Sequence, residues 1–566
     1  MASTSRVIPS LQAGGGNPSE SSSHKTVQHL SPKVLKHLKT IFHKLGKSKD
    51  HLDKGDITDF FGHLQGAEPS SVGQIDVWDG EQRSPSDVES TSLEPEPKQR
   101  RGLRLPGSRS PRRKLSDAKA EKETIHVKAE EPGTPTPSVS PTTTMRAEPR
   151  VLHGYTLTKD VSFRDVCAAI KDAAFVTSNL PVIVSLEVHA SIEQQKTMVE
   201  IMKESWKDML VDDSTYVEGK GLPSPENLRH KLLVKVKRAA PSKPDETTPD
   251  TPLVVPDRVR SNSSTSSSED RGGSSKGAKK KKNKVAEALG NLGIYTRSYH
   301  FSHFSQPEAS IPTHVFSLSE KAVMDAHENH GEALFAHNLN YFMRAYPSGL
   351  RVSSSNLDPS MFWRKGIQMV ALNWQRWDQG MMLNEGMFAG EGGWVLKPEG
   401  YRGNDDSQSG GQAKAIAHKT LNLTIEIFAA QDIPLPVGDQ KSDGFRPYIK
   451  CELHVEKPEE RTGEPIEGGG KTKDGEYKRK TATRKGVDPD FKGETMKFTG
   501  IPGVVEELSF LRFKIQDDEI GKDDLAAWAC IRLDRLQKGY RFVHLLDARG
   551  AESRGVVLVR ISKEMR

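Results

Sequence analysis

Two parts of this sequence, residues 150–238 and 285–402, alternate short apolar runs with amphipathic helices. In the first part the apolar runs are PVIVSLE and KLLVKVK, and the helical segments are SFRDVCAAIKDAAF and SIEQQKTMVEIMKESWKDML. In the second part HVFSLSEKAVMDAHEN predicts a strand followed by a helix, and IQMVALNW predicts a buried strand. Such alternation favours parallel strands joined by crossover helices, with polar chemistry at the carboxyl ends of the strands. The sequence therefore predicts an α/β domain assembled from two separated blocks.

Local signals place the first of these helices and its buried face. Ser162 and Asp165 have the spacing of a capping box at its start. Four apolar side chains then share one face of the helix: Phe163, Val166, Ile170 and Ala174. In KLLVKVK, Lys235 and Lys237 alternate onto one side of the strand.

Long polar tracts separate the foldable parts. Hydrophobic residues make up 34% of the 566 residues, against about 45–50% in typical globular domains. We expect residues 1–27, 81–149 and 239–284 to be disordered, because they are poor in the apolar side chains that build a core. The last tract contains four consecutive lysines at 279–282, which suit a solubilising linker, an anionic membrane surface or a nuclear address.

Residues 28–68 predict a helical pair of the EF-hand type. Ser31 is the expected N-cap and Pro32 the first helical residue. An apolar stripe follows, formed by Val34, Leu35, Leu38, Ile41 and Phe42. The intervening KSKDHLDKGD lacks the ligand spacing of a calcium loop, so a structural role is expected.

Residues 418–566 change to alternating strands with Gly, Pro and Asp between them. This pattern is typical of a β-sandwich. The expected strands are LNLTIEIFAA, RPYIKCELHVE, TMKFTG, LSFLRFKIQD, WACIRL, RFVHLL and VVLVRIS.

Charge and cysteine content exclude some classes of protein. The chain has 82 basic and 76 acidic residues, a net charge of +6, so no nucleic-acid partner is expected. Cys167, Cys451 and Cys530 lie far apart and predict neither a disulfide framework nor a zinc knuckle. No apolar run reaches the ~18 residues that span a bilayer. We expect a cytoplasmic protein whose membrane contact is peripheral, at the cytosolic face.

Several motifs resemble the X and Y halves of eukaryotic phosphoinositide-specific phospholipases C of the delta-like type. The matching segments are IDVWDG (75–80), VLHGYTLT (151–158), residues 162–195, LLVKVK (232–237), FSLSE (316–320), RAYPSGLRVSSSN (344–356) and MVALNWQ (369–375). The resemblance implies a distorted TIM barrel split into an X half, residues 69–80 and 150–238, and a Y half, residues 285–402.

The same resemblance implies an enzyme that hydrolyses phosphatidylinositol 4,5-bisphosphate to inositol 1,4,5-trisphosphate and diacylglycerol, in signal transduction and lipid metabolism. It implies Ca²⁺ as cofactor, held by Asp76 and Glu187, and His153 as the proton donor to the leaving group. Carboxylates are suited to Ca²⁺, and histidine titrates near neutral pH. The residues implied to hold the phosphorylated ring are Lys235, Lys237, Ser317, Arg344 and Tyr346.

The chain also departs from the family pattern. The family's first X-half strand carries a catalytic His-Asn pair, and nothing between Met1 and Asp76 matches it. His337 and Asn338 form a His-Asn dipeptide in the Y half, on a predicted helix. Gln74 stands where the family has a Glu. The alternative is therefore a catalytically impaired member that binds phosphoinositide or membrane, with the first part of the X half missing.

Each site residue also has a purely structural interpretation. Glu187 suits a solvated loop acid, His153 a turn and the lysines an exposed face. Ser317 suits an N-cap, because Glu320 three residues later completes a capping box.

The predicted sandwich resembles the C2 domain that follows the barrel in this family, most specifically in PYIKCELHV and LQKGYRFVHLL. Its loops contain five aspartates suited to Ca²⁺: Asp439, Asp443, Asp517, Asp518 and Asp523. Arg446 stands before Pro447 where strong Ca²⁺-binding members have Asp, so docking against the barrel is the alternative role. Protein partners are not indicated by the sequence.

Overall fold

The computed structural model describes residues 29–45, 56, 60, 148–152, 159–211, 221–238, 285–403, 418–458, 477–519 and 523–566. The predicted ligand Asp76, the predicted proton donor His153 and nearly all of the three tracts expected to be disordered lie outside these residues; Glu148 and Pro149, at the end of the second tract, are described. Most of the second helix of the predicted pair does so as well.

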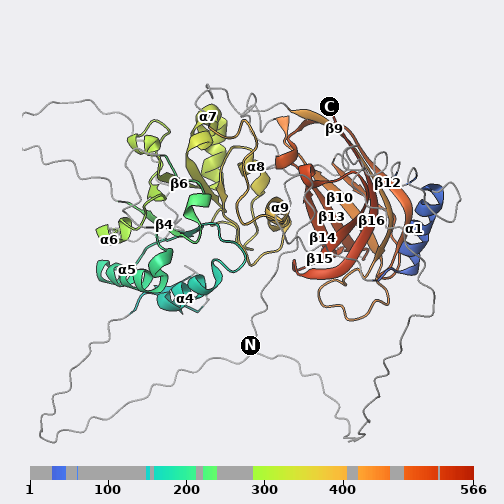
Figure 1. Ribbon diagram of the computed structural model, residues 1–566, viewed down its shortest axis with the longest axis horizontal. Helices are drawn as coiled ribbons and strands as arrows, with labels where there is room; N and C mark the ends of the chain where they lie inside the picture. Colours follow the sequence, from blue (N-terminus) through green and yellow to red (C-terminus); the bar gives the residue numbers. More distant parts are fainter. Residues whose placement is uncertain are drawn as a thin grey trace, which may run out of the picture. The chain divides into compact units, whose positions relative to one another are not determined.

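A six-stranded parallel sheet joins the two blocks of the α/β domain (Figure 1). Its order follows the chain: β3 (Val182–Ser185), β4 (Leu232–Lys237), β5 (Arg297–Tyr299), β6 (His314–Ser319), β7 (Phe342–Tyr346) and β8 (Met369–Val370). The first block supplies β3 and β4, and the second block supplies the rest. They meet where β4 pairs with β5, with Val236 opposite Arg297. The prediction of one parallel α/β sheet from two separated blocks is confirmed.

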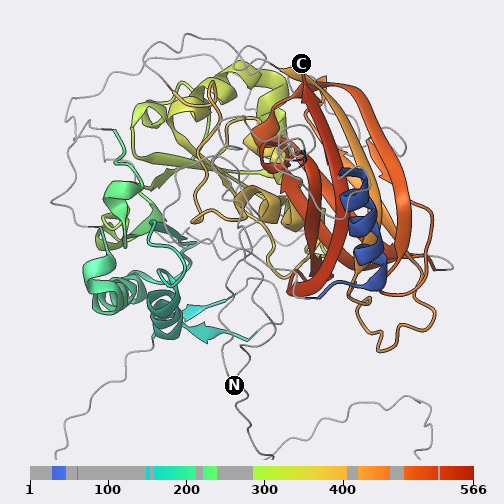
Figure 2. The ribbon, with the colours of Figure 1, turned by 45° about the vertical axis from the view of Figure 1, so that its right-hand side comes forward.

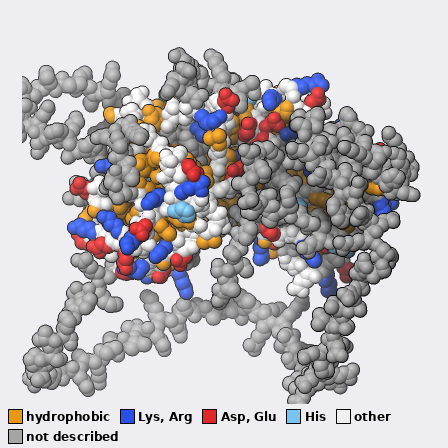
Figure 3. All heavy atoms as spheres, viewed as in Figure 1, with side chains coloured by type: hydrophobic (Ala, Val, Ile, Leu, Met, Phe, Trp, Pro, Cys, Tyr) orange, Lys and Arg blue, Asp and Glu red, His pale blue; other side chains and the backbone are white. Residues whose placement is uncertain are grey.

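Helices follow the strands, as expected for this fold. The described α-helices of this domain are α4 (Phe163–Ala173), α5 (Ile192–Trp206), α6 (Glu287–Gly290), α7 (Glu320–Asn340), α8 (Pro359–Trp363) and α9 (Gln379–Phe388). Trp206 is fully buried between α4, α5 and the sheet, and its Nε1 donates to the Cys167 carbonyl at 2.9 Å. None of the described helices is long and apolar enough to cross a membrane. In Figure 3, the surface over α4 and α5 mixes acidic and basic side chains.

Two of the predicted helix caps are wrong. Ser162 precedes α4 but makes no capping hydrogen bond, because β1 (Arg150–Val151) pairs with β2 (Val161–Ser162) and the Phe163 N–H donates to the Pro149 carbonyl. Ser317 lies inside β6, and Ser319 caps α7 by accepting from Ala322 N at 3.2 Å. Phe163, Ile170 and Ala174 of the predicted apolar face of α4 pack into the core, whereas Val166 is not part of the cluster and Cys167, which was not predicted, is buried.

The C-terminal domain is an antiparallel sheet of eight described strands in the order β11-β10-β13-β14-β15-β16-β9-β12. Their bounds are β9 (Lys419–Gln431), β10 (Pro447–His454), β11 (Lys478–Lys480), β12 (Asp490–Val504), β13 (Phe510–Asp517), β14 (Asp524–Arg532), β15 (Gly539–Asp547) and β16 (Glu552–Met565). Ile427 on β9 and Phe513 on β13 share one core although their strands are not neighbours, so the sheet folds onto itself as the predicted sandwich. The short β11 was not predicted.

The first helix of the predicted pair, α1 (Pro32–Leu45), packs on this sandwich (Figure 2). Val34 contacts Ala429 and Leu558, and Ser31 N donates to Gln431 Oε1 at 2.9 Å. Leu35 and Phe42 are exposed, so the buried stripe is narrower than predicted.

Side chains of the α/β domain also pack against the sandwich. Arg364 donates through Nε and Nη2 to the Leu508 carbonyl at 3.2 and 3.1 Å, and Trp363 shares a buried cluster with Trp528. A Cβ on Gly386 of α9 would lie 2.8 Å from Cys530 Sγ, so the helix contacts β14 without a gap.

Candidate active site

The register of the parallel sheet brings the predicted ring-binding residues to one edge. Lys235 pairs with Ser185, Lys237 with Ser298 and Arg344 with Ser317 across neighbouring strands. Tyr346 ends β7, opposite Ser319. All five predicted residues therefore lie toward the carboxyl ends of β4, β6 and β7, where domains of this architecture keep their chemistry.

Lys235 is the most buried cation of this edge, with 5% of the residue exposed. Its Nζ lies 3.5 Å from the hydroxyls of Ser185 and Ser298. Burial, together with the charges of Arg344 and Lys237, lowers the pKa of Lys235 to about 8. Because burying a cation without a counter-ion is costly, such a site favours an anionic ligand.

Arg344 links this lysine to the aromatic ring and to a carboxylate. Its Cζ lies 5.4 Å from the centroid of the Tyr346 ring. Burial lowers the pKa of Arg344, while Tyr346 and Glu187 act in the opposite direction. Burial raises the pKa of Tyr346, which Arg344 opposes and Glu187 increases. Glu187 of the first block is thus an electrostatic neighbour of both residues of the second block.

Ser317 presents a buried hydroxyl beside Arg344. Its Oγ has no hydrogen-bond partner among the described residues. Buried polar atoms are nearly always paired in native proteins, with protein, water or ligand. A phosphate oxygen at this edge would supply the acceptor that the hydroxyl lacks.

Glu187 lies two residues after the end of β3, with its side chain 78% exposed and its Oε1 3.1 Å from His189 Nε2. An exposed carboxylate oxygen is the kind of ligand that Ca²⁺ takes, so this residue fits the implied cation. The other implied Ca²⁺ ligand, Asp76, and the implied proton donor, His153, lie outside the residues that the structure describes. The His337–Asn338 dipeptide lies in α7, and His337 Nε2 is 2.7 Å from His314 Nε2.

Sequence reasoning missed the two serines that flank Lys235. Ser185 and Ser298 each come at or near the end of a short strand, and strand alternation alone does not indicate which residues face each other across a parallel pair. The partners follow only once the register is known.

The loops of the sandwich carry an acidic group that partly matches the prediction. Asp439, Asp517 and Glu519 have carboxylate oxygens within 4.8 Å of one another. Glu519 was not predicted. Two other predicted aspartates have protein partners: Asp518 Oδ2 lies 3.4 Å from Arg446, and Asp523 accepts from the Tyr448 hydroxyl at 2.6 Å. Asp443 is not part of the group.

Comparison with protein families gives the class. Residues 72–238 match the phosphatidylinositol-specific phospholipase C X domain, residues 289–400 match the Y domain of the same family, and residues 421–547 match the C2 domain. These matches cover the parallel sheet and the sandwich up to the end of β15, in the order in which the resemblance places them.

Two curated relatives agree with this class, and one solved structure agrees with the fold. The 1-phosphatidylinositol 4,5-bisphosphate phosphodiesterase 1 of Candida albicans is 34% identical over 453 residues, covering 72% of this chain and 40% of the relative. The delta-1 phosphodiesterase of Homo sapiens is 32% identical over 430 residues, covering 73% and 53%. The crystal structure of PLC21 from S. officinalis superposes with a TM-score of 0.56 at 24% identity, covering 74% of this chain and 49% of that one.

The chain belongs to the phosphatidylinositol-specific phospholipase C family, and several of its relatives are of the delta type. It spans between 40% and 53% of the length of the two relatives described above. The match to a solved structure at this identity supports the TIM-barrel-type fold alone.

Proposed function

We propose that this protein is a phosphoinositide phospholipase C that hydrolyses phosphatidylinositol 4,5-bisphosphate to inositol 1,4,5-trisphosphate and diacylglycerol. The observation that carries the proposal is the buried cation Lys235 of the X half, next to Arg344 and the unpaired Ser317 hydroxyl of the Y half. A ligand with several phosphates on one small ring satisfies all three groups at once.

Each site residue takes a role in this reaction. Lys235, Lys237, Ser317 and Arg344 bind the ring phosphates, and Tyr346 packs against the inositol ring. Charge-assisted hydrogen bonds to these phosphates orient the ring, so that its 2-hydroxyl faces phosphorus. The 2-hydroxyl oxygen attacks phosphorus and its proton passes to water, while His153 donates a proton to the departing diacylglycerol oxygen. Water then opens the resulting cyclic phosphodiester to give inositol 1,4,5-trisphosphate.

Glu187 and Asp76 are the proposed ligands of Ca²⁺. When bound, the ion lowers the pKa of the attacking hydroxyl and offsets the charge that develops on phosphorus. The acidic group of the sandwich, Asp439, Asp517 and Glu519, is a second candidate position for a divalent cation.

Exposed apolar side chains on loops at the same edge suit contact with a lipid surface. Val352 is 94% exposed and Leu350 68%, in the segment after β7, and Trp374 is 67% exposed after β8. Large exposed apolar side chains around a site are typical of membrane or partner contact. We propose that the protein works at the cytosolic face of a membrane. We also propose that the X half comprises residues 69–80 and 150–238, the Y half residues 285–402 and the C2 domain residues 418–566.

Hydrolysis by the full chain tests this function. Vesicles of phosphatidylcholine containing phosphatidylinositol 4,5-bisphosphate are incubated with the protein, and released inositol trisphosphate is measured with Ca²⁺ and with a chelator. Release that requires Ca²⁺ and falls by about 100-fold or more in His153→Ala is the expected result. Binding of these vesicles without release at any Ca²⁺ concentration would instead identify the non-catalytic alternative.

The pKa of Lys235 makes headgroup affinity depend on pH. Its pKa is lowered to about 8 in the free site, and a bound phosphate raises it again. The attraction is therefore fully present below pH 8 and is lost as pH rises above it, by up to about tenfold in affinity per pH unit. The measurement is calorimetric titration with inositol 1,4,5-trisphosphate from pH 7.5 to 9.5. Lys235→Arg keeps its charge over this range, so its profile should be flat; an equal slope in both proteins would contradict the assignment.

A further inference from the structure

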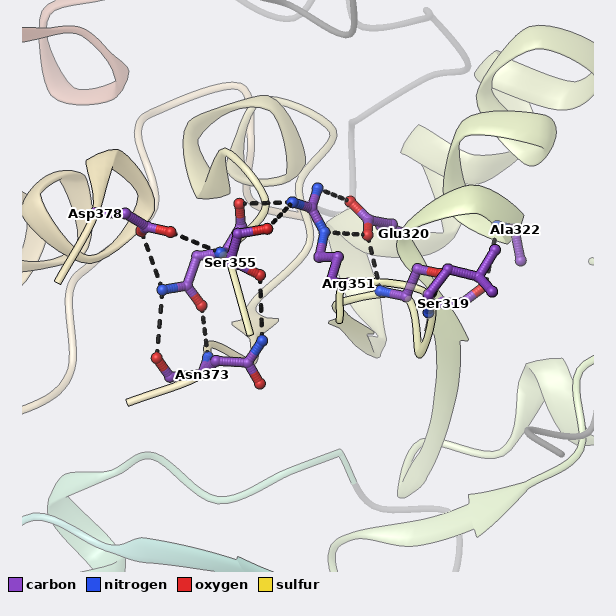
Figure 4. A network of polar contacts seen from close by, with 10 residues as sticks. Ser319, Glu320, Ala322, Arg351, Ser355, Asn373 and Asp378 are labelled. Carbon is purple, nitrogen blue, oxygen red and sulfur yellow. Dashed lines mark hydrogen bonds and ion pairs between the residues drawn. The ribbon is translucent and has the colours of Figure 1, made fainter. Parts of the chain in front are cut away.

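Glu320 and Arg351 form a two-pronged ion pair beside the proposed headgroup site. Arg351 Nε lies 2.6 Å from Glu320 Oε1, and Nη2 lies 2.6 Å from Oε2. The side chain of Arg351 is 29% exposed and that of Glu320 17%, so both are shielded from solvent more than a surface pair is. Glu320 is the first residue of α7, directly after β6, and Arg351 lies in the segment after β7 (Figure 4).

The same carboxylate fixes the backbone next to Tyr346. Ser348 N donates to Glu320 Oε1 at 2.8 Å, two residues beyond the ring. Burial raises the pKa of Glu320, but the hydrogen bonds from Arg351 and Ser348 N outweigh it, so the net shift is downward. Glu320 is therefore ionised at neutral pH and able to hold both donors.

The third nitrogen of Arg351 continues the network. Nη1 donates to Ser355 Oγ and to the Asn356 carbonyl, both at 3.0 Å. The preceding residue, Ser354, has a φ of 53°, a left-handed conformation that costs a non-glycine residue about 1–3 kcal/mol. Contacts on both sides of Ser354 are what holds such a turn in place.

Asn356 then connects this segment to the loop after β8. The backbone N–H of Asn356 donates to Asp378 Oδ2 at 2.8 Å, and Asn373 N donates to the side-chain Oδ1 of Asn356 at 2.5 Å (Figure 4). Asp378 is the N-cap of α9. One polar network thus joins the start of α7, directly after β6, to the segments that follow β7 and β8.

We propose that the Glu320–Arg351 pair is a positioning device for headgroup recognition, which holds the loop after β7 against the end of β6 so that Ser317, Arg344 and Tyr346 meet the ring together. The inference rests on the proposed function. Neither Glu320 nor Arg351 is assigned a contact with the ligand; they act through the backbone that carries Tyr346. Misplacement of binding groups by about 1 Å can lower a reaction rate by up to 100-fold.

Titration of the full chain with soluble inositol 1,4,5-trisphosphate, alongside thermal melting, tests the proposal. Arg351→Lys keeps the charge and loses the two-pronged geometry, so affinity should fall about tenfold or more. The matched control is Arg560→Lys, which breaks a similarly exposed pair with Glu426 in the sandwich, 3.3 Å apart with side chains 32% and 29% exposed. That control should melt lower by a similar small amount and keep wild-type affinity.

A second variant and a double substitution separate positioning from general destabilisation. Ser355→Ala removes one hydrogen bond donated by the Arg351 guanidinium and should lower affinity about two- to threefold; it decides the matter if Arg351→Lys does not fold. Glu320→Gln and Arg351→Lys combined should lose little more affinity than either alone, because they act through one contact.

The outcomes distinguish this inference from the function on which it rests. Failure of the wild-type chain to bind inositol trisphosphate overturns both. Wild-type binding with unchanged affinity in Arg351→Lys, or in Ser355→Ala where the first variant does not fold, overturns the positioning role and leaves the proposed function standing.

Discussion

Replacing Lys235 with methionine is expected to weaken binding of inositol 1,4,5-trisphosphate by roughly 100-fold. Lys235 is 5% exposed as a residue and lies near two further cations, Arg344 and Lys237. Removing one partner of a buried charged hydrogen bond typically costs about 2–5 kcal/mol, and every 1.4 kcal/mol is about tenfold. The free energy of unfolding should not decrease, because burying a methionine side chain costs less than burying a cation.

Lys231, directly before the same strand, offers a matched control. It precedes β4 at the opposite end of the strand, and its Nζ donates to the Asp208 carbonyl at 2.8 Å. Lys231→Met removes the same charge from the chain without touching the proposed site, so calorimetry should find wild-type affinity. Equal losses in the two variants would mean that long-range charge, and not the site, controls binding.

Replacing Trp206 with alanine is expected to destabilise the α/β domain by about 3–5 kcal/mol, as for other fully buried tryptophans. The side chain is 1% exposed, packs among residues of α4, α5 and β4, and loses its hydrogen bond to Cys167 as well. For a domain of this size the melting temperature should fall by about 10 °C. Differential scanning calorimetry of the full chain gives the shift.

Trp374→Ala serves as the control, since this tryptophan is 67% exposed. Removal of an exposed side chain usually changes the free energy of unfolding by no more than about 0.5 kcal/mol. A comparable drop in melting temperature for Trp374→Ala would contradict the burial that the fold assigns to the two tryptophans.

The regular elements could be predicted because their patterns are local. The apolar runs at residues 181–187 and 231–237 predicted β3 and β4. All seven strands expected in the sandwich also have counterparts in the structure. Ser191 caps α5 by accepting from Gln194 N at 3.3 Å, whereas the similar Ser162 does not cap α4, since strand pairing fixes its backbone elsewhere. Propensity at one residue cannot reveal such competition.

The cations of the site could be predicted from the sequence, but the residues that contact them could not. Lys235 and Arg344 were found through the family resemblance, and the sheet places them near each other. Ser298 follows Lys235 by more than sixty residues, and Arg351 follows Glu320 by about thirty, so neither partnership leaves a periodic signal in the sequence. Register and loop geometry, which arise only on folding, decide those contacts.

A crystal structure of the full chain with inositol 1,4,5-trisphosphate tests the central claim most directly, namely that the X and Y halves share one headgroup site. The account predicts ring phosphates within hydrogen-bond distance of Lys235 Nζ from one half and of Arg344 and Ser317 Oγ from the other. A headgroup bound elsewhere, or contacting residues of one half alone, would contradict it.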